Sequence, residues 1–179
     1  MTYQLRALAL LLGVVLGAAL LAPPAAASAG GLEVTCTPPS SNNVTYNPPL
    51  TQSPQTVTVS SSVTYNPCVS LTQPTLTSGT RANVIVSTRS CPDLLASAPA
   101  TFTINWNTGQ SSTISGTSNT STAGALIVVA ITGTVTAGLF AGAAVTQVNT
   151  APSAQILLCT LGLGTVSNLT SLVTLTITS

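Results

Sequence analysis

The chain has 179 residues, of which 45% are hydrophobic and 3% charged, and its formal net charge is +1 at pH 7. It contains no His, and the only charged side chains after residue 29 are Glu33, Arg81, Arg89 and Asp93, so it lacks the proton-transfer groups that most enzyme classes need. We therefore expect neither enzymatic activity nor a cofactor, and the near-neutral charge also argues against nucleic acid and anionic lipid as partners.

The first 29 residues have the features of a secretory signal peptide. One positive charge at Arg6 precedes a nearly unbroken apolar run at 7–22, a pair of prolines ends that run, and small residues follow at 27–29. A retained transmembrane anchor is the alternative, but the run is only about fifteen residues, whereas a spanning helix needs about 20. We predict that residues 1–29 are cleaved, which leaves a secreted, extracellular protein without a membrane span.

Residues 30–179 are predicted to form a single folded domain. A segment of about 150 residues usually forms one domain and buries enough surface for a hydrophobic core. The competing interpretation is a disordered stalk rich in Ser and Thr. Disorder normally accompanies low hydrophobicity and high net charge, and this chain has the opposite composition.

One short motif occurs twice in the first half of the domain. Val44–Pro49 recurs almost unchanged as Val63–Cys68, and each copy contains Tyr-Asn-Pro. Because Pro cannot donate a hydrogen bond within a sheet, the pattern favours two edge strands that each end in a Tyr-Asn-Pro turn. The alternative is that Tyr46 and Tyr65 form an aromatic binding face.

Apolar residues that alternate with Thr and other polar residues predict a series of short strands. Strands are expected at 55–59, 81–89, 101–106, 112–115, 125–136 and 172–178, with a turn of helix at 91–98 and a hairpin turn at 107–110. The continuous apolar run at 125–131 predicts a central strand that is buried on both faces. Short strands separated by Gly, Pro and Asn favour an antiparallel β-sandwich, immunoglobulin-like or jelly-roll-like, over a small barrel.

All four cysteines lie in the predicted domain, at Cys36, Cys68, Cys91 and Cys159. An even number in a secreted chain predicts two disulfide bonds. A zinc site is the alternative, but zinc sites use closely spaced cysteines, usually with His, and this chain has neither. Of the three possible pairings we favour Cys36–Cys68 with Cys91–Cys159.

Other candidate sites have weaker signals. The glycine-rich segment 133–142 lacks the Lys of a phosphate-binding loop and is more typical of bulges or sharp bends. Glu33 and Asp93 are the only candidates for a glycosidase pair, and a helix cap and a surface charge are the simpler interpretation. The aromatic residues that could contact a ligand are Trp106, Tyr46, Tyr65 and Phe140, and for Trp106 the alternating pattern favours a place in the core.

Three segments resemble small secreted proteins of filamentous, Streptomyces-like actinobacteria. These segments are Trp106–Ile114, Gly133–Gly142 and the closing strand that contains Leu175–Ile177. The resemblance implies an extracellular, disulfide-bearing β domain of unknown function, and it transfers no functional residue. Relatives in that group carry an acidic residue where this chain has Ala143, and this departure argues against a cation site there.

Two classes of function are consistent with these features. The first is a non-catalytic extracellular domain that binds a protein, a glycan or the cell wall. The second is a self-assembling, surface-active envelope protein, because low charge and strand edges without Lys favour edge-to-edge pairing. A secreted protease inhibitor is a further alternative, with possible display loops at 68–79 and 91–99.

Overall fold

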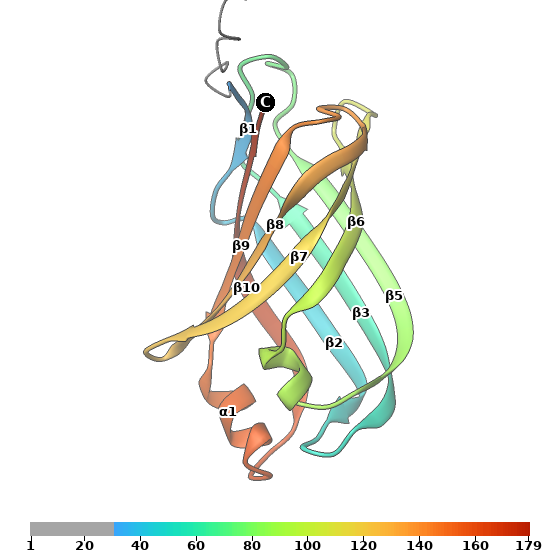
Figure 1. Cartoon of the computed structure of the whole chain (residues 1–179), viewed down its shortest axis with the longest axis vertical. Helices are drawn as coiled ribbons and strands as arrows, with labels where there is room; N and C mark the ends of the chain where they lie inside the picture. Colours follow the sequence, from blue (N-terminus) through green and yellow to red (C-terminus); the bar gives the residue numbers. More distant parts are fainter. Residues whose placement is uncertain (1–30) are drawn as a thin grey trace, which may run out of the picture.

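The computed structural model describes residues 31–179, so the predicted signal peptide at 1–29 lies outside the described residues. The described part is built almost entirely of β-strands (Figure 1). In chain order the elements are β1 (Leu32–Cys36), β2 (Ser41–Leu50), β3 (Gln55–Tyr65), β4 (Cys68–Val69), β5 (Gly79–Arg89), the 3-10 helix η1 (Pro92–Leu95), β6 (Ala98–Trp106), β7 (Ser111–Ala123), β8 (Leu126–Gly138), β9 (Ala144–Pro152), α1 (Ala154–Thr160) and β10 (Val166–Thr178). No helix within residues 31–179 has the length and apolar character to cross a membrane.

The sheet closes into an antiparallel barrel. Its strands follow the order β2-β3-β5-β6-β7-β8-β9-β10, and β10 also pairs with β2. The prediction of an all-β fold is confirmed, whereas the prediction of a sandwich is wrong. Closure depends on β10, which pairs with β2 through Val166–Leu172 and with β9 through Leu172–Thr178, and thus joins the two ends of the sheet.

β1 and β4 lie outside this ring at the end that holds the C-terminus (Figure 1). β1 pairs with the last residues of β10 and with β4, and Cys36 bonds to its register partner Cys68. The second disulfide joins Cys91, just before η1, to Cys159 in α1. Both bridges confirm the pairing favoured from the sequence.

Strand pairing corrects the expectation that the repeated motif forms edge strands. β2 pairs with β3 and β10, and β3 pairs with β2 and β5, so neither strand lies at an edge. The prolines still mark the limits of pairing, because the β2–β3 register ends at Asn47, immediately before Pro48, and Pro67 follows the end of β3.

Burial confirms some of the predicted strand faces and corrects two. The alternation at 81–89 predicts that Val84 and Val86 are buried, but they are 66% and 69% exposed. Val173, Leu175 and Ile177 of β10 are fully buried, as their alternation predicted. The run at 125–131 is not buried on both faces, because β8 is one layer of a barrel and its outer face is open to solvent. Leu126 is accordingly 43% exposed, whereas its neighbour Ile127 is buried.

The predicted turns are confirmed at two places. Trp106 and Gly109 close the β6–β7 hairpin through a backbone hydrogen bond of 3.0 Å. The β8–β9 connection turns sharply at Gly138 and Gly142, whose φ angles of 84° and 91° are readily adopted only by glycine. The expected helical turn at 91–98 is present in part as η1.

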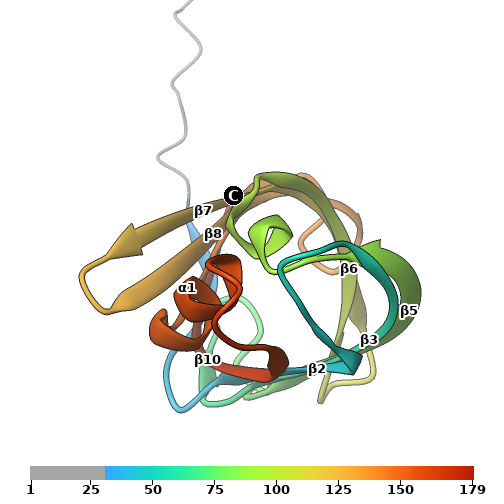
Figure 2. The ribbon, with the colours of Figure 1, turned by 90° about the horizontal axis from the view of Figure 1, so that it is seen from below.

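The barrel interior holds two clusters of buried apolar side chains. Cluster 1, at the β1–β4 end, includes Tyr65, Trp106 and Ile177. Cluster 2, at the α1 end, includes Tyr46, Ile127 and Ile156. Figure 2 shows α1 and η1 lying across this second end of the barrel. The candidate site lies beside cluster 2.

Candidate functional site

The barrel wall is incomplete between β5 and β6. β5 pairs with β3 along all 11 of its residues, whereas its register with β6 contains only Gly79 with Trp106 and Thr80 with Asn105. In Figure 1 the two strands come together toward the end that holds the C-terminus and separate toward the end that holds α1. We call this unpaired region, between residues 81–89 of β5 and residues 98–104 of β6, the seam.

Local packing holds β5 against β6 at Gly79, immediately before the seam begins at residue 81. A Cβ atom at Gly79 would lie only 2.6 Å from the Trp106 ring, so glycine allows the indole to pack directly against β5. At the other end of β5, the Cys91 amide donates to the Thr51 carbonyl at 2.8 Å and Cys91 is bonded to Cys159. β5 therefore stays with β3, while β6 follows β7 along the register from Ala98 to Asn105.

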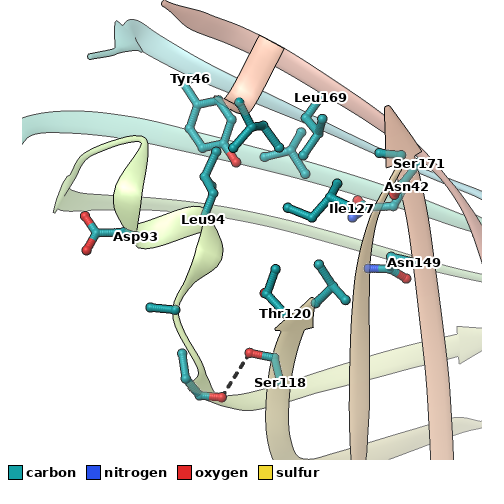
Figure 3. A pocket seen from close by; sticks show the side chains of 16 residues that line it. Asn42, Tyr46, Asp93, Leu94, Ser118, Thr120, Ile127, Asn149, Leu169 and Ser171 are labelled. Atoms are coloured by element: carbon teal, nitrogen blue, oxygen red, sulfur yellow. Dashed lines mark hydrogen bonds between the residues drawn. The ribbon is translucent and has the colours of Figure 1, made fainter. Parts of the chain in front are cut away.

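Inside the barrel, next to cluster 2, is a cavity of about 230 Å³ (Figure 3). Its apolar lining comes from the barrel strands and from the two helical segments that cover this end. The principal apolar residues are Val44, Leu94, Ile127, Val129, Ile156 and Leu169. Polar side chains from β2, β9 and β10 line the same space, so the cavity combines an apolar body with hydrogen-bonding groups.

Four of the polar residues that line the cavity have an atom without a protein hydrogen-bond partner. The Oδ1 atom of Asn42 accepts from the Ser61 hydroxyl at 3.1 Å, and that of Asn149 accepts from the Gln147 amide at 2.8 Å. No residue within 31–179 bonds the Nδ2 group of either asparagine or the hydroxyls of Tyr46 and Ser171. Yet these four residues are only 6–8% exposed.

These atoms are accessible from the cavity. Among the described residues, every fully enclosed side-chain nitrogen or oxygen has a hydrogen-bond partner, so the unpaired atoms of this set are not sealed within the protein. Figure 3 shows the amides of Asn42 and Asn149 and the Tyr46 hydroxyl directed toward the pocket. Buried polar groups in proteins are normally hydrogen-bonded, so these atoms are suited to bind acceptor atoms of a guest molecule.

Titratable groups near the cavity do not form an acid–base pair. Burial raises the pKa of Tyr46 to about 12, with Arg89 acting in the opposite direction. The Asp93 carboxylate accepts 2.7 Å hydrogen bonds from the hydroxyl and the amide of Ser90, which lower its pKa, and it points away from the cavity (Figure 3). Glu33 lies on β1 and accepts from Thr72, so the structure does not bring the two carboxylates together.

A groove of about 390 Å³ runs along the seam and leads toward the cavity, with which it shares Val44, Ser118 and Val129. Arg81 and Arg89 of β5 line the groove on one side, and Phe102 of β6 lies on the other. The Arg81 guanidinium stacks 4.1 Å above the centre of the Phe102 ring. The seam is thus a route from solvent to the inner cavity.

The aromatic residues proposed from sequence do not share one surface. Tyr65 and Trp106 are buried in cluster 1, with ring centres 6.4 Å apart, and Phe140 packs against the same indole. The Trp106 Nε1 group donates to the Ser112 hydroxyl at 2.8 Å, as expected for a core tryptophan. Tyr46 lies at the other end of the barrel and is the only one of the four that lines the cavity.

Asn42, Asn149 and Ser171 were not among the site residues predicted from the sequence. A usable signal was present in β9, where Gln147 and Asn149 occupy the same alternating positions as the buried residues Val145 and Ala151. Polar residues on the inward face of a strand indicate an internal network or a ligand site.

Residues 31–179 contain no group of three or more His, Cys, Asp or Glu side chains that could hold a metal ion.

Comparisons with known proteins add no family assignment. No protein-family model matches the chain, and neither a search of curated proteins nor a search of solved structures finds a match. The geometry of the cavity and the seam is therefore the basis for a functional proposal.

Proposed function

We propose that this protein is a secreted, non-catalytic binding protein that holds one small molecule inside its barrel. The observation that carries the proposal is the set of unpaired polar atoms that the largely buried residues Asn42, Tyr46, Asn149 and Ser171 present to an apolar cavity. Apolar walls with a few convergent polar groups are the usual composition of small-molecule sites. All four groups, two amides and two hydroxyls, can donate a hydrogen bond, and they come from three strands, β2, β9 and β10, which fixes the orientation of a guest.

The size of the cavity supports a ligand of one or two rings or a short chain. A protein cavity of about 150 Å³ holds a benzene molecule, and eight-stranded barrels have room for one small ligand. The cavity here measures about 230 Å³ and continues into the seam. A small molecule therefore suits this site better than the protein, glycan or cell-wall partner expected from the sequence.

The cross-links support an extracellular location. The domain is cross-linked by two disulfides, and such bonds persist in oxidising compartments. The absence of His and the two separated carboxylates support a binding function over catalysis.

A matched pair of cavity variants tests the proposal. Val129 lines both the cavity and the groove, whereas its neighbour Val128 on β8 points to the outer face. We expect the protein to bind the neutral two-ring fluorescent probe 6-propionyl-2-(dimethylamino)naphthalene saturably with a single site. Val129→Phe should weaken that binding at least tenfold because the ring occupies the cavity, and Val128→Phe should leave it unchanged.

Fluorescence titration gives the dissociation constants, and thermal melting confirms that both variants are folded. If the parent protein shows no saturable binding, or if both variants bind as the parent does, the cavity is not a ligand site. The proposal would then be wrong.

A second candidate, self-assembly, is favoured by the free edge of β5. Residues 81–89 lack a partner strand on the seam side, and Val84 and Val86 on this strand are 66% and 69% exposed. An exposed apolar strand edge without Lys is the feature that pairs with other chains.

A further inference from the structure

The described residues contain only two cations, and both border the seam. Arg81 and Arg89 occupy positions of the same parity on β5, as do Asn83 and Ile85, and all four line the groove. Since side chains alternate between the two faces of a strand, the two arginines lie on the inner face. Positive charge is therefore concentrated at the entrance to the cavity.

The two arginines differ in their surroundings. Arg89 donates to the Ser87 hydroxyl at 3.3 Å, and it lies close enough to Asp93 to contribute to the lowered pKa of that carboxyl, after the Ser90 hydrogen bonds. Its charge is thus partly balanced. Arg81 has no carboxylate and no side-chain hydrogen-bond partner within residues 31–179, and it contacts the face of Phe102 instead.

No acceptor within residues 31–179 engages the N–H groups of the Arg81 guanidinium, so its contact with the Phe102 ring leaves these donors free. A guanidinium donates its N–H bonds in its own plane, so a ring placed against its face fixes the group without using those donors. Arg81 is held in place yet keeps a fork of donors that matches a carboxylate.

Polarity changes along the path from the outside to the cavity. Outside the groove, Arg81 borders a pocket of about 300 Å³ that is lined by the polar side chains of Asn83, Thr103 and Asn105. Arg81 and Phe102 line both this outer pocket and the groove, and the groove shares apolar residues with the cavity. A molecule that spans this path has a polar end at Arg81 and an apolar end within the barrel.

We infer that the ligand is an anionic amphiphile, with a carboxylate bound by Arg81 at the seam and an apolar body in the barrel cavity. The inference rests on the proposed binding function and adds to it the chemical class of the ligand and the residue that selects for charge. A fatty-acid-like or aryl-alkyl carboxylate has this chemistry.

The test compares two probes that differ only in their head group. Octanoate, which is anionic at pH 7, and 1-octanol are titrated by calorimetry into the protein and into its variants. We expect Arg81→Gln to weaken octanoate binding at least tenfold and to leave octanol binding unchanged, because a charge-assisted bidentate contact is lost. Arg81→Lys, which keeps the charge and loses the fork, should retain part of the preference.

Arg89→Gln is the matched control, because it removes the same charge from the same face of the same strand. Because Arg89 also lines the groove but is partly balanced by Asp93, Arg89→Gln should change the ratio of the two dissociation constants at least threefold less than Arg81→Gln does. If Arg81→Gln leaves that ratio unchanged while octanol still binds, the ligand is not selected by Arg81, and the inference fails although the binding function stands. A loss confined to Arg89→Gln also overturns it. If neither probe binds any form, the proposed function itself fails.

Discussion

A hydrogen-bonded series of three buried polar residues sets the orientation of the Asn149 side-chain amide, which lines the cavity. The Tyr65 hydroxyl donates to Gln147 Oε1 at 2.8 Å, and Gln147 Nε2 donates to Asn149 Oδ1 at 2.8 Å. Because the Asn149 oxygen is engaged, its Nδ2 group faces the cavity. Tyr65 thus acts on the site from cluster 1, without touching the cavity.

Replacement of each tyrosine by phenylalanine separates the two roles. Tyr65→Phe leaves a fully buried amide oxygen without its donor, and we expect it to lower the free energy of unfolding by about 1–3 kcal/mol. Tyr46→Phe removes a hydroxyl without a protein partner, and we expect a change within about 0.5 kcal/mol. Urea unfolding measures both, and similar losses in the two variants would contradict this account.

Among the elements, β5 differs most from its neighbours. Its whole length pairs with β3, but its other side is free beyond Thr80. Two inward-facing arginines flank the free segment, and inward charges on an edge strand discourage pairing with other chains. The exposed valines between them act in the opposite direction, so the strand carries both the arginine that we propose to select the ligand and residues that favour association.

One substitution on β5 tests whether this edge drives self-assembly. If it does, the parent protein forms larger species as its concentration rises, and Val84→Lys prevents this because a charge would be buried between paired edges. Thr132→Lys adds the same charge to β8, where Thr132 is paired on both sides, and should associate as the parent does. Sedimentation velocity over a concentration series measures the effect. A parent protein that stays monomeric throughout would remove the second candidate function.

At the level of the whole molecule, the scarcity of titratable groups predicts an unusual pH profile. Burial raises the pKa values of Tyr46 and Tyr65 to about 12, with Arg89 and Arg81 acting in the opposite direction. Between pH 10 and 12 the unfolded chain loses these protons while the folded protein keeps them, so stability falls as pH rises through this range. The contribution of Asp93 has the opposite sign: it is present above the ordinary carboxyl pKa and is lost as pH falls through the lowered one.

We therefore expect the urea midpoint to be constant between about pH 5 and 9, since no side chain of residues 31–179 has an ordinary pKa there. The midpoint should fall above about pH 10. The double variant Tyr46→Phe/Tyr65→Phe should lose most of that alkaline decline. A midpoint that drifts across the neutral range would show that this assignment of the titrating groups is incomplete.

The sequence predicts the buried face of strands such as β10, but it predicts the face of β5 wrongly and does not predict the closure of the barrel. Val173, Leu175 and Ile177 show the alternation that local sequence reveals, and the cysteine count predicts the cross-links. Closure depends on β10 pairing with β2, which is more than 100 residues away, and no local pattern encodes that contact.

The candidate site was hard to predict for a related reason. β2 contains Asn42, Asn43 and two prolines, so it lacks the alternating apolar pattern of a buried strand. Asn42 faces a cavity and not a packed core, so its position on the inner face of β2 does not require an apolar residue. The sequence therefore gives no hydrophobic pattern that marks Asn42 as inward-facing. The helix α1 has only 7 residues, too few to show a helical period.

The bond between Cys91 and Cys159 bears on how a guest molecule would come and go. It ties together η1 and α1, which supply Leu94 and Ile156 to the floor of the cavity. Because this disulfide holds the α1 end of the barrel closed, a guest would enter and leave through the seam between β5 and β6. The residence time of the guest would then depend on fluctuations of the unpaired seam between β5 and β6. It would also depend on how long Arg81 keeps its contact with Phe102.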